Sequence, residues 1–336
     1  MRNFRTATLG ATMLALLLGA CTSGGSGSSA STAASEPPAS TAPSVESSAE
    51  ASAGPSIAST LVLGGPPECP ERPFCLVGLE KTYGLKFKEF TPLDAGGPLT
   101  VQALTGGQIQ VGLLFTSDPA IAVNGFVLLQ DDKQLQLADN LIPVVRKEVA
   151  VANPLVADTL NAVMAKLSQA ELTELNKAVT IDLTPTADAA KAWLTKVAIP
   201  ATGGGSGSLT VGSTNFYEQE ILGEIFAQAL EANGFTVERK FQLGNREIVF
   251  PALESGEIDI LAEYAATALE FVNGGAGQAS TDPAATSAAF VTALEPKGLV
   301  ALEYAEATDQ NGFVVTKATA DQYGLVTIGD LAKPAS

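Results

Sequence analysis

Two stretches of the chain carry the same pattern, and each ends on an aromatic ring. Residues 103–115 read ALTGGQIQVGLLF and residues 252–264 read ALESGEIDILAEY, so both follow A-L-x-x-G-x-I and close on Phe115 or Tyr264. A helix end, a glycine turn and an apolar strand form one αβ unit. Because ring faces attract cations, we expect the two rings to occupy matching positions facing one site, with plain core packing as the alternative role.

A second set of candidates lies where predicted strands give way to helices. Free backbone N–H groups at a helix N-terminus bind carboxylates well. Asn215 and Glu218 also have the spacing of a capping box, so capping alone stays an alternative for Asn215, and Thr116 and Asp118 share this ambiguity. Arg246 either binds a ligand carboxylate or lies in a surface ion pair. The candidates at these positions are Thr116, Asp118, Asn215, Phe216, Gln219, Asn245 and Arg246.

The composition excludes several classes of function. The chain has 336 residues, no histidine and a net charge of −17. Without histidine there is no Ser-His-Asp or Cys-His site and no usual catalytic zinc site, so we expect no enzyme, no cofactor and no metal. Nucleic-acid binding needs patches rich in Lys and Arg, which argues against it here. The charge weakly favours a cationic or zwitterionic ligand.

The start of the chain indicates export. A basic beginning and an apolar run up to Ala20 predict a signal peptide over 1–20, and the run is too short for a lasting membrane span. Leu18-Gly19-Ala20-Cys21 resembles a bacterial lipobox, which implies a lipid on Cys21. Residues 21–59 have no aromatic residue and are rich in Ser, Ala and Thr, which predicts a flexible tether without a fold.

A pair of cysteines lies just beyond the tether. Cys69 and Cys75 belong to the segment PPECPERPFC, which follows an export signal. An oxidising compartment favours a disulfide between them over two free thiols.

Apolar strands and helices alternate from residue 61 onward, which predicts an α/β protein. Matching blocks recur in the same order in both halves, so we expect two similar mixed sheets flanked by helices. The run Gly203–Ser208 has the composition of a flexible linker, and we place that linker at 202–208.

The motifs resemble a known family. GSTNFYEQEILGEIFAQALEANG and, earlier in the chain, LVLGGPPE with LLFTSDPAIAVNG are similar to the two halves of substrate-binding proteins of quaternary-amine (osmoprotectant) ABC transporters for glycine betaine, choline and carnitine. The halves stand in reversed order, so the chain resembles a circularly permuted member. The resemblance implies a two-lobed, periplasmic-binding-protein-like fold of type II whose hinge is two crossing strands. Lobe B is then 60–138 plus 310–336, and lobe A is 139–309 with the linker inside it.

The resemblance also adds site residues. Tyr264 matches a tyrosine of the family's aromatic cage, and Thr267 lies beside it. Asn311 falls where several members carry a cage tyrosine, Asp139 falls near another, and Asp309 faces the hinge. Compared with a cage of four tyrosines, this chain lacks two rings and has two additional carboxyl groups, which predicts a more polar cleft.

These observations predict an extracytoplasmic, lipid-anchored monomer that captures a small quaternary-ammonium solute between its lobes and delivers it to an ABC permease. Two alternatives stay open: a solute-sensing receptor domain and a binding protein for a polar, non-quaternary solute. An enzyme is the weakest reading, because Asp118, Glu263 and Asp309 offer acid–base groups but no assembled site.

Overall fold

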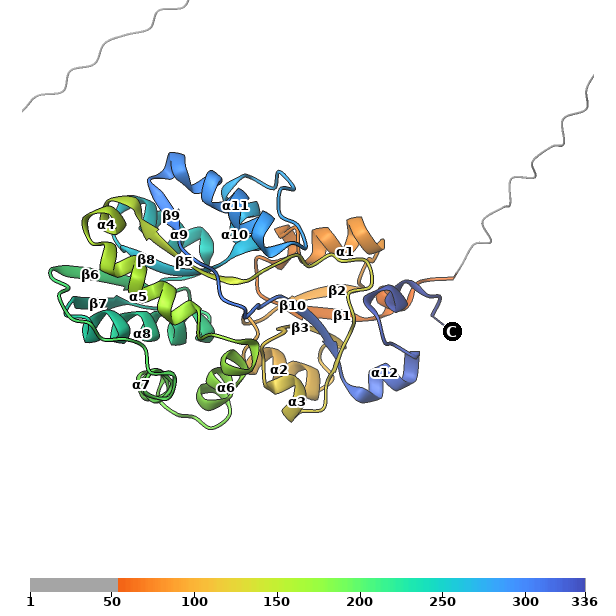
Figure 1. Cartoon of the computed structure of the whole chain (residues 1–336). Coiled ribbons are helices and arrows are strands. Elements are labelled where there is room, and N and C mark those ends of the chain that lie inside the picture. The colour runs from red at the N-terminus through yellow and green to blue at the C-terminus, as the bar shows by residue number, and fades with distance from the viewer. Residues whose placement is uncertain (1–53, 336) are drawn as a thin grey trace, which may run out of the picture. The chain divides into compact units, whose positions relative to one another are not determined.

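The computed structural model describes residues 54–335, which form two five-stranded mixed sheets flanked by helices (Figure 1). The first sheet has the order β2-β1-β3-β10-β4. In it β1 pairs in parallel with β2 and β3, whereas β10 is antiparallel to β3 and β4. Its strands are β1 (Val62–Gly65), β2 (Glu89–Pro92), β3 (Val111–Phe115), β4 (Val127–Leu128) and β10 (Asn311–Val315).

The second sheet repeats this topology with the order β7-β6-β8-β5-β9. Here β6 pairs in parallel with β7 and β8, and β5 is antiparallel to β8 and β9. Its strands are β5 (Leu141–Arg146), β6 (Ser208–Gly212), β7 (Thr236–Lys240), β8 (Ile260–Tyr264) and β9 (Leu299–Ala301). The strands of the first sheet come from the residues assigned to lobe B and those of the second from lobe A, and we use these names for each sheet with its helices.

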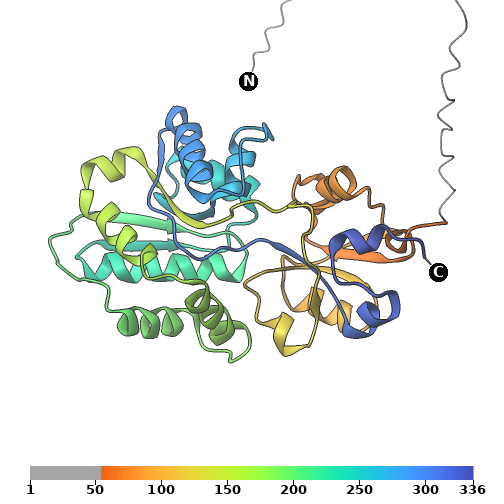
Figure 2. The same cartoon turned by 45° about the vertical axis from the view of Figure 1, so that its right-hand side comes forward.

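Two segments carry the chain between the lobes (Figure 2). One leads into β5 and the other into β10, so each crossing strand lies between the third and the last strand of its sheet. The segments pair with each other through an antiparallel bridge between Asn140 and Thr308, and the Asp309 amide donates to the Asp139 carbonyl at 3.1 Å. The predicted two-lobed α/β fold of type II is confirmed.

Alternating side chains give each sheet a core on both faces. In β5, Leu141 and Val145 point into one apolar cluster, while Ile142 and Val144 point into another. This follows from the two-residue period of a strand. Lobe B has the same division, with two apolar clusters that between them include residues of β3 and β10. Phe115 packs against clusters of both lobes, which places the end of β3 at the lobe boundary.

The helices cover the faces of the two sheets. Helix α8 buries Ile221, Leu222, Ile225 and Phe226 in lobe A, and the turn after it is made at Gly234, whose φ of +102° favours glycine. The α-helices are α1 (Leu76–Tyr83), α2 (Pro98–Thr105), α3 (Ala120–Val123), α4 (Lys147–Ala152), α5 (Pro154–Met164), α6 (Gln169–Thr180), α7 (Thr186–Val197), α8 (Tyr217–Ala232), α9 (Arg246–Ser255), α10 (Ala265–Val272), α11 (Pro283–Leu294) and α12 (Lys317–Tyr323). Four short 3-10 helices complete the set: η1 (Ile57–Thr60), η2 (Cys69–Glu71), η3 (Glu295–Lys297) and η4 (Ile328–Ala332).

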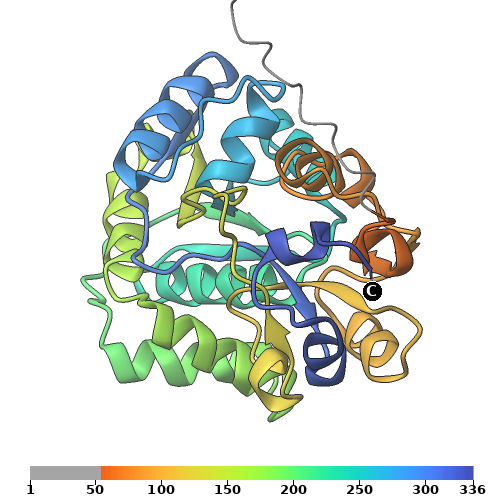
Figure 3. The same cartoon turned by 90° about the vertical axis from the view of Figure 1, so that its right-hand side faces the viewer.

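The tether prediction is wrong for its last residues. Ile57 and Ala58 in η1 are buried, and the Ile57 amide donates to the Lys333 carbonyl at 2.8 Å. The Ala335 amide donates to the Pro55 carbonyl at 2.8 Å, so the two ends of the described chain lie side by side (Figure 3). The end of this Ser/Ala-rich stretch is therefore attached to lobe B by two buried apolar side chains and by these backbone hydrogen bonds. The predicted signal peptide, Cys21 and the tether up to residue 53 lie outside the described residues.

The linker prediction is wrong at one end. Ser208 belongs to β6 rather than to the linker. Within 202–207, the Gly205 amide donates to the Asn233 carbonyl at 2.8 Å, and Thr202 donates to the side chain of the same residue. The segment is therefore attached to the end of α8 at two points.

Candidate functional site

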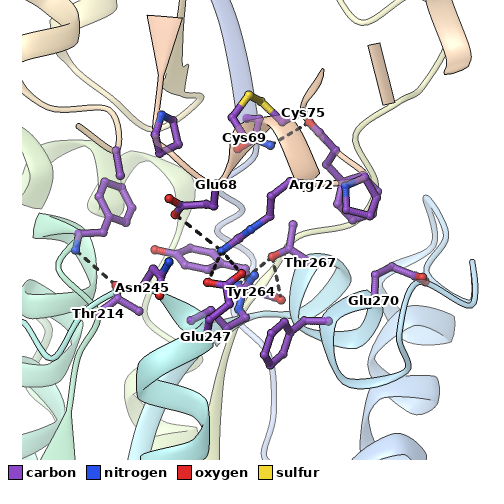
Figure 4. A pocket seen from close by; sticks show the side chains of 18 of the residues that line it. Glu68, Cys69, Arg72, Cys75, Thr214, Asn245, Glu247, Tyr264, Thr267 and Glu270 are labelled. Carbon is purple, nitrogen blue, oxygen red and sulfur yellow. Dashed lines mark hydrogen bonds and ion pairs between the residues drawn. A yellow bond between two sulfur atoms is a disulfide. The ribbon is translucent and has the colours of Figure 1, made fainter. Parts of the chain in front are cut away.

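A cavity of about 420 Å³ lies between the lobes, at the ends of β3 and β8 (Figure 4). Lobe B contributes the loop 66–75 and the end of β3, and lobe A contributes the first residues of α8, α9 and α10. Eleven of the thirteen predicted ligand contacts line it: Phe115, Asp139, Asn215, Phe216, Gln219, Asn245, Arg246, Tyr264, Thr267, Asp309 and Asn311. The repeat therefore does bring Phe115 and Tyr264 to one cavity.

Three of the five aromatic rings that line the cavity lie at the ends of β3 and β8 and at the start of α8. Phe115 of lobe B lies against Phe216 of lobe A, with ring centroids 4.4 Å apart and planes tilted by 39°. Phe216 and Tyr264 are buried, whereas Phe115 is half-buried. Each ring follows from the local sequence, since Phe115 and Tyr264 end their strands and Phe216 is the residue before the first turn of α8.

Arg246, at the first position of α9, forms a buried ion pair with Glu263. Its Nε donates to both Glu263 oxygens at 3.0 Å, and its Nη2 donates to Glu263 Oε2 at 2.8 Å and to Thr267 Oγ1 at 3.0 Å. The Thr267 amide in turn donates to Asp139 Oδ1 at 2.9 Å. Burial alone would lower the pKa of Arg246, but the charge and hydrogen bonds of Glu263 outweigh it and the pKa is raised. The predicted surface ion pair is wrong, because both partners are buried.

Glu218 of α8 is fully buried and joins the two lobes. Its Oε2 accepts from Ser117 Oγ at 2.7 Å and from Asn176 Nδ2 at 2.6 Å, and its Oε1 accepts from Tyr264 Oη at 2.8 Å. The Ser117 amide donates to Asp309 Oδ1 at 3.0 Å. Burial raises the pKa of Glu218 although these donors oppose it, and burial together with the charge of Glu218 raises the pKa of Asp309 well above its usual range.

The loop of lobe B that covers the cavity is closed by a disulfide between Cys69 and Cys75, as predicted (Figure 4). Arg72 at its tip crosses to lobe A, where its Nη2 donates to Glu247 Oε1 at 2.9 Å and Oε2 at 3.0 Å. Glu68 of the same loop lies 3.7 Å from this nitrogen. The loop therefore brings a guanidinium group to the cavity mouth.

Thr116 and Asp118 are not brought to the cavity wall. Thr116 exchanges hydrogen bonds with Gln310 of the second crossing segment, at 2.9 Å and 3.0 Å. Asp118 Oδ1 accepts from the Ala120 amide at 2.7 Å at the start of α3. Burial raises the pKa of Asp118 to about 6.

The predicted capping box at the start of α8 is wrong. Phe216 is the N-cap residue, no side chain caps the helix, and Glu218 points into the buried network instead. Asn215 is exposed and Asn245 half-buried at the cavity wall. Asn311 Nδ2 donates to the Phe74 carbonyl at 2.9 Å, so this side chain holds the disulfide loop in place.

The cavity is strongly acidic. Seven carboxyl groups line it but only two guanidinium groups, and each guanidinium is hydrogen-bonded to a carboxylate. Burial raises the pKa of Asp139 to about 7, while the Thr267 amide and the charge of Arg246 oppose the rise. Such a surplus of carboxyl groups favours a cationic group over an anionic one.

Six further residues line the cavity that the sequence did not indicate: Arg72, Glu68 and Phe74 of the disulfide loop, Glu247 of α9, and Glu270 and Phe271 of α10. The sequence indicated Glu218 only as a helix cap. A detectable signal existed for Arg72, since an arginine between two cysteines six positions apart is held at the tip of a closed loop.

Two lobes that close on one acidic, ring-lined cavity define a solute-binding protein. In the described part of the chain, no group of three His, Cys, Asp or Glu side chains is arranged to hold a metal ion. None of the helices between residues 54 and 335 has both the length and the apolar character needed to cross a membrane.

The chain belongs to the family described as the substrate-binding domain of ABC-type glycine betaine transport systems, which matches residues 37–196 and 207–336. Membership makes it a binding protein rather than an enzyme and confirms the resemblance to quaternary-amine binding proteins.

Individual relatives match over shorter stretches. A glycine-betaine-binding protein of Pseudomonas aeruginosa is 35% identical over 126 residues, which is 37% of this chain and 40% of that protein. A carnitine transport binding protein of Listeria monocytogenes is 29% identical over 96 residues, or 29% of this chain and 30% of that protein. Each match therefore spans less than half of the relative. Among solved structures, an ancestral arginine-binding protein bound to arginine aligns with a TM-score of 0.40 and 15% identity, over 82% of this chain and 92% of that one.

Proposed function

We propose that this protein captures a small quaternary-ammonium solute, such as glycine betaine, carnitine or choline, between its lobes and delivers it to an ABC importer. The observation that carries the proposal is an acidic cavity whose rings come from both lobes. A quaternary ammonium group carries a diffuse charge and donates no hydrogen bond. Each ring contact to such a group contributes about 0.5–2 kcal/mol.

The cavity also suits a ligand carboxylate. Arg72 and Arg246 come from opposite lobes, and in residues 54–335 no protein acceptor binds the Nη1 atom of either. Burial and the charge of Arg246 lower the pKa of Arg72, so an anion between the two groups relieves their repulsion. A zwitterion would place its ammonium group at the rings and its carboxylate at these arginines.

A polar solute without a quaternary amine is the second candidate. The observation that favours it is that Asp139 and Asp309 line the cavity, since these carboxyl groups also suit a ligand with N–H donors. A receptor that senses the same solute would share the cavity and differ only in its partner.

Calorimetric titration with matched ligands tests the proposal. Glycine betaine and 3,3-dimethylbutyrate have the same shape, but only the first carries a positive charge. We expect glycine betaine to bind at least about tenfold more tightly, which corresponds to about 1.4 kcal/mol. Choline and carnitine test whether the carboxylate is needed. Equal affinity for the charged and uncharged members of the pair, or no heat with any quaternary amine, would contradict the proposal.

We also propose that the chain order is a circular permutation and that Cys21 carries a lipid anchor outside the cytoplasm. The antiparallel bridge between Ser56 and Pro334 supports the circular permutation, because the two ends of a permuted chain must lie close together. A chain that is opened within 202–207 and joined between 335 and 54 should fold and bind as this one does. Mass spectrometry of the mature protein tests the anchor: a first residue other than a lipidated cysteine contradicts it.

A further inference from the structure

Four carboxyl groups lie buried at the lobe junction without a cation to neutralise them. Asp118, Asp139, Glu218 and Asp309 are 6%, 4%, 0% and 3% exposed. None of them forms an ion pair with a Lys or Arg side chain of the described residues. We call these four residues the carboxyl cluster. Burying a carboxylate without a counter-charge is costly, so such groups tend to hold a proton instead.

The cluster is connected across the lobes. Ser117 of lobe B donates its hydroxyl to Glu218 at 2.7 Å and its amide to Asp309 at 3.0 Å, so one residue bridges two acids. The second Asp309 oxygen, Oδ2, is buried and has no hydrogen-bond partner in the described chain. Asp139 and Asp309 also line the ligand cavity, which opens the cluster to a ligand.

The groups around the cluster do not supply the missing positive charge. Tyr217 and Tyr264 of α8 and β8 are neutral phenols whose pKa burial raises well above the usual value. Asp94, before α2, acts on Asp118 as a further acid. Within residues 54–335, Arg246 is the cation whose charge lowers the pKa of Asp139, and Glu263 already binds this arginine.

We infer that binding of the cationic solute releases a proton from the carboxyl cluster, whose ionised groups then balance the ligand's charge. The inference rests on the proposed function, since it needs a cation in this cavity. In the free protein, burial raises the pKa of Asp139 to about 7 and that of Asp309 well above its usual range, so protons are bound near neutral pH. A cation at the rings favours the charged form of a nearby carboxyl and lowers its pKa.

The direction of the pH dependence follows from this linkage. If the complex binds fewer protons than the free protein, affinity rises with pH until the free cluster has lost the same protons. For one proton released, the dissociation constant falls by about tenfold per pH unit. We expect this rise in affinity below about pH 7 and a plateau above it, because the pKa of Asp139 in the free protein is about 7.

Calorimetry in two buffers measures the proton directly. Choline is titrated into the protein at pH 7 and 8 in phosphate and in Tris, which take up protons with different heats, and at pH 6 in phosphate alone. We expect release of about 0.3–1 proton per choline at pH 7 and tighter binding at pH 8 than at pH 6. Binding with the same heat in both buffers would overturn the inference but leave the proposed function intact, whereas no heat with choline, carnitine or glycine betaine would contradict both.

Two variants test which carboxyl group releases the proton when choline binds. Asp309→Asn removes one acid but keeps the oxygen that accepts from Ser117, so we expect weaker choline binding and less proton release than in the wild type. Asp282→Asn is the matched control, because Asp282 is an exposed N-cap of α11 and Asn caps equally well. Equal release by Asp309→Asn and the wild type would exclude Asp309, and Asp139→Asn then tests the other acid of the cluster that lines the cavity. The wild-type measurement decides the inference even if a variant fails to fold.

Discussion

Each lobe places an aromatic ring at the end of the third strand of its sheet, yet the two lobes hold these rings differently. Tyr264 of lobe A is buried, its hydroxyl donates to Glu218, and the neighbouring Glu263 is paired with Arg246. Phe115 of lobe B is half-buried, packs against apolar clusters of both lobes and contacts Phe216 across the boundary. The repeat thus fixes where the rings stand, while the side chains around them decide how firmly each is held.

This difference indicates which parts of the cavity depend on closure of the lobes. Lobe A holds its part of the cavity through buried contacts of its own, so that part should keep its shape when the lobes separate. Lobe B contributes Phe115 and Arg72, whose partners Phe216 and Glu247 belong to lobe A. Its contributions therefore depend on closure, as expected for lobes that move about a hinge.

The largest expected effect comes from breaking the buried ion pair of lobe A. Arg246→Met leaves the Glu263 carboxylate buried and unpaired, which should lower the free energy of unfolding by about 3–5 kcal/mol. Urea denaturation followed by circular dichroism measures it. Arg146→Met is the control, because that arginine is 24% exposed and pairs with Asp259 at the surface of the same lobe. A loss of less than about 1 kcal/mol for both would show that lobe A is not preorganised by this pair.

Replacing either ring by leucine should have an effect of intermediate size, and it tests whether the two lobes hold their rings differently. Tyr264→Leu and Phe115→Leu each remove one ring face, so each should weaken choline binding by about 2- to 30-fold. Only Tyr264→Leu also leaves a Glu218 oxygen without its donor, so it should lower the free energy of unfolding by about 1–3 kcal/mol more than Phe115→Leu does.

Tyr264→Phe separates the two roles of this residue. It should keep the affinity for choline and show the loss of stability, because the ring stays and the hydroxyl is removed. Calorimetry and thermal denaturation of the three variants measure both quantities. Equal losses of stability in Tyr264→Leu and Phe115→Leu would contradict the different anchoring of the rings.

Much of the fold was predictable because periodicity and turns are local. The repeat located both sheets and the matching ring positions of Phe115 and Tyr264. Helix starts and the family resemblance supplied the other nine predicted residues that line the cavity. Glu218 was not predictable as a buried acid, because three-residue spacing at a helix start also matches a capping box. Its true partners, Ser117 and Asn176, are about a hundred and about forty residues away in the chain. The ordered segment Ser56–Ala58 was missed because its composition resembles that of the preceding tether.

The smallest effect concerns the ion pair between the lobes. Arg72 and Glu247 are 28% and 42% exposed, so their pair contributes at most about 1 kcal/mol, which alters the balance of open and closed forms by up to about fivefold. Glu247→Gln should therefore raise the radius of gyration of the free protein in small-angle scattering while leaving the free energy of unfolding within about 1 kcal/mol of the wild type.

The matched control for this last change is Glu254→Gln on the same helix. Glu254 and Lys297 form an ion pair of similar exposure, but both residues belong to lobe A. Removing that pair cannot separate the lobes, so the scattering curve of Glu254→Gln should match the wild type. If both variants give the wild-type curve, the disulfide loop does not hold the lobes together through Arg72. Closure then depends on the Phe115–Phe216 contact and the Ser117–Glu218 hydrogen bond, which join the same two lobes deeper in the boundary.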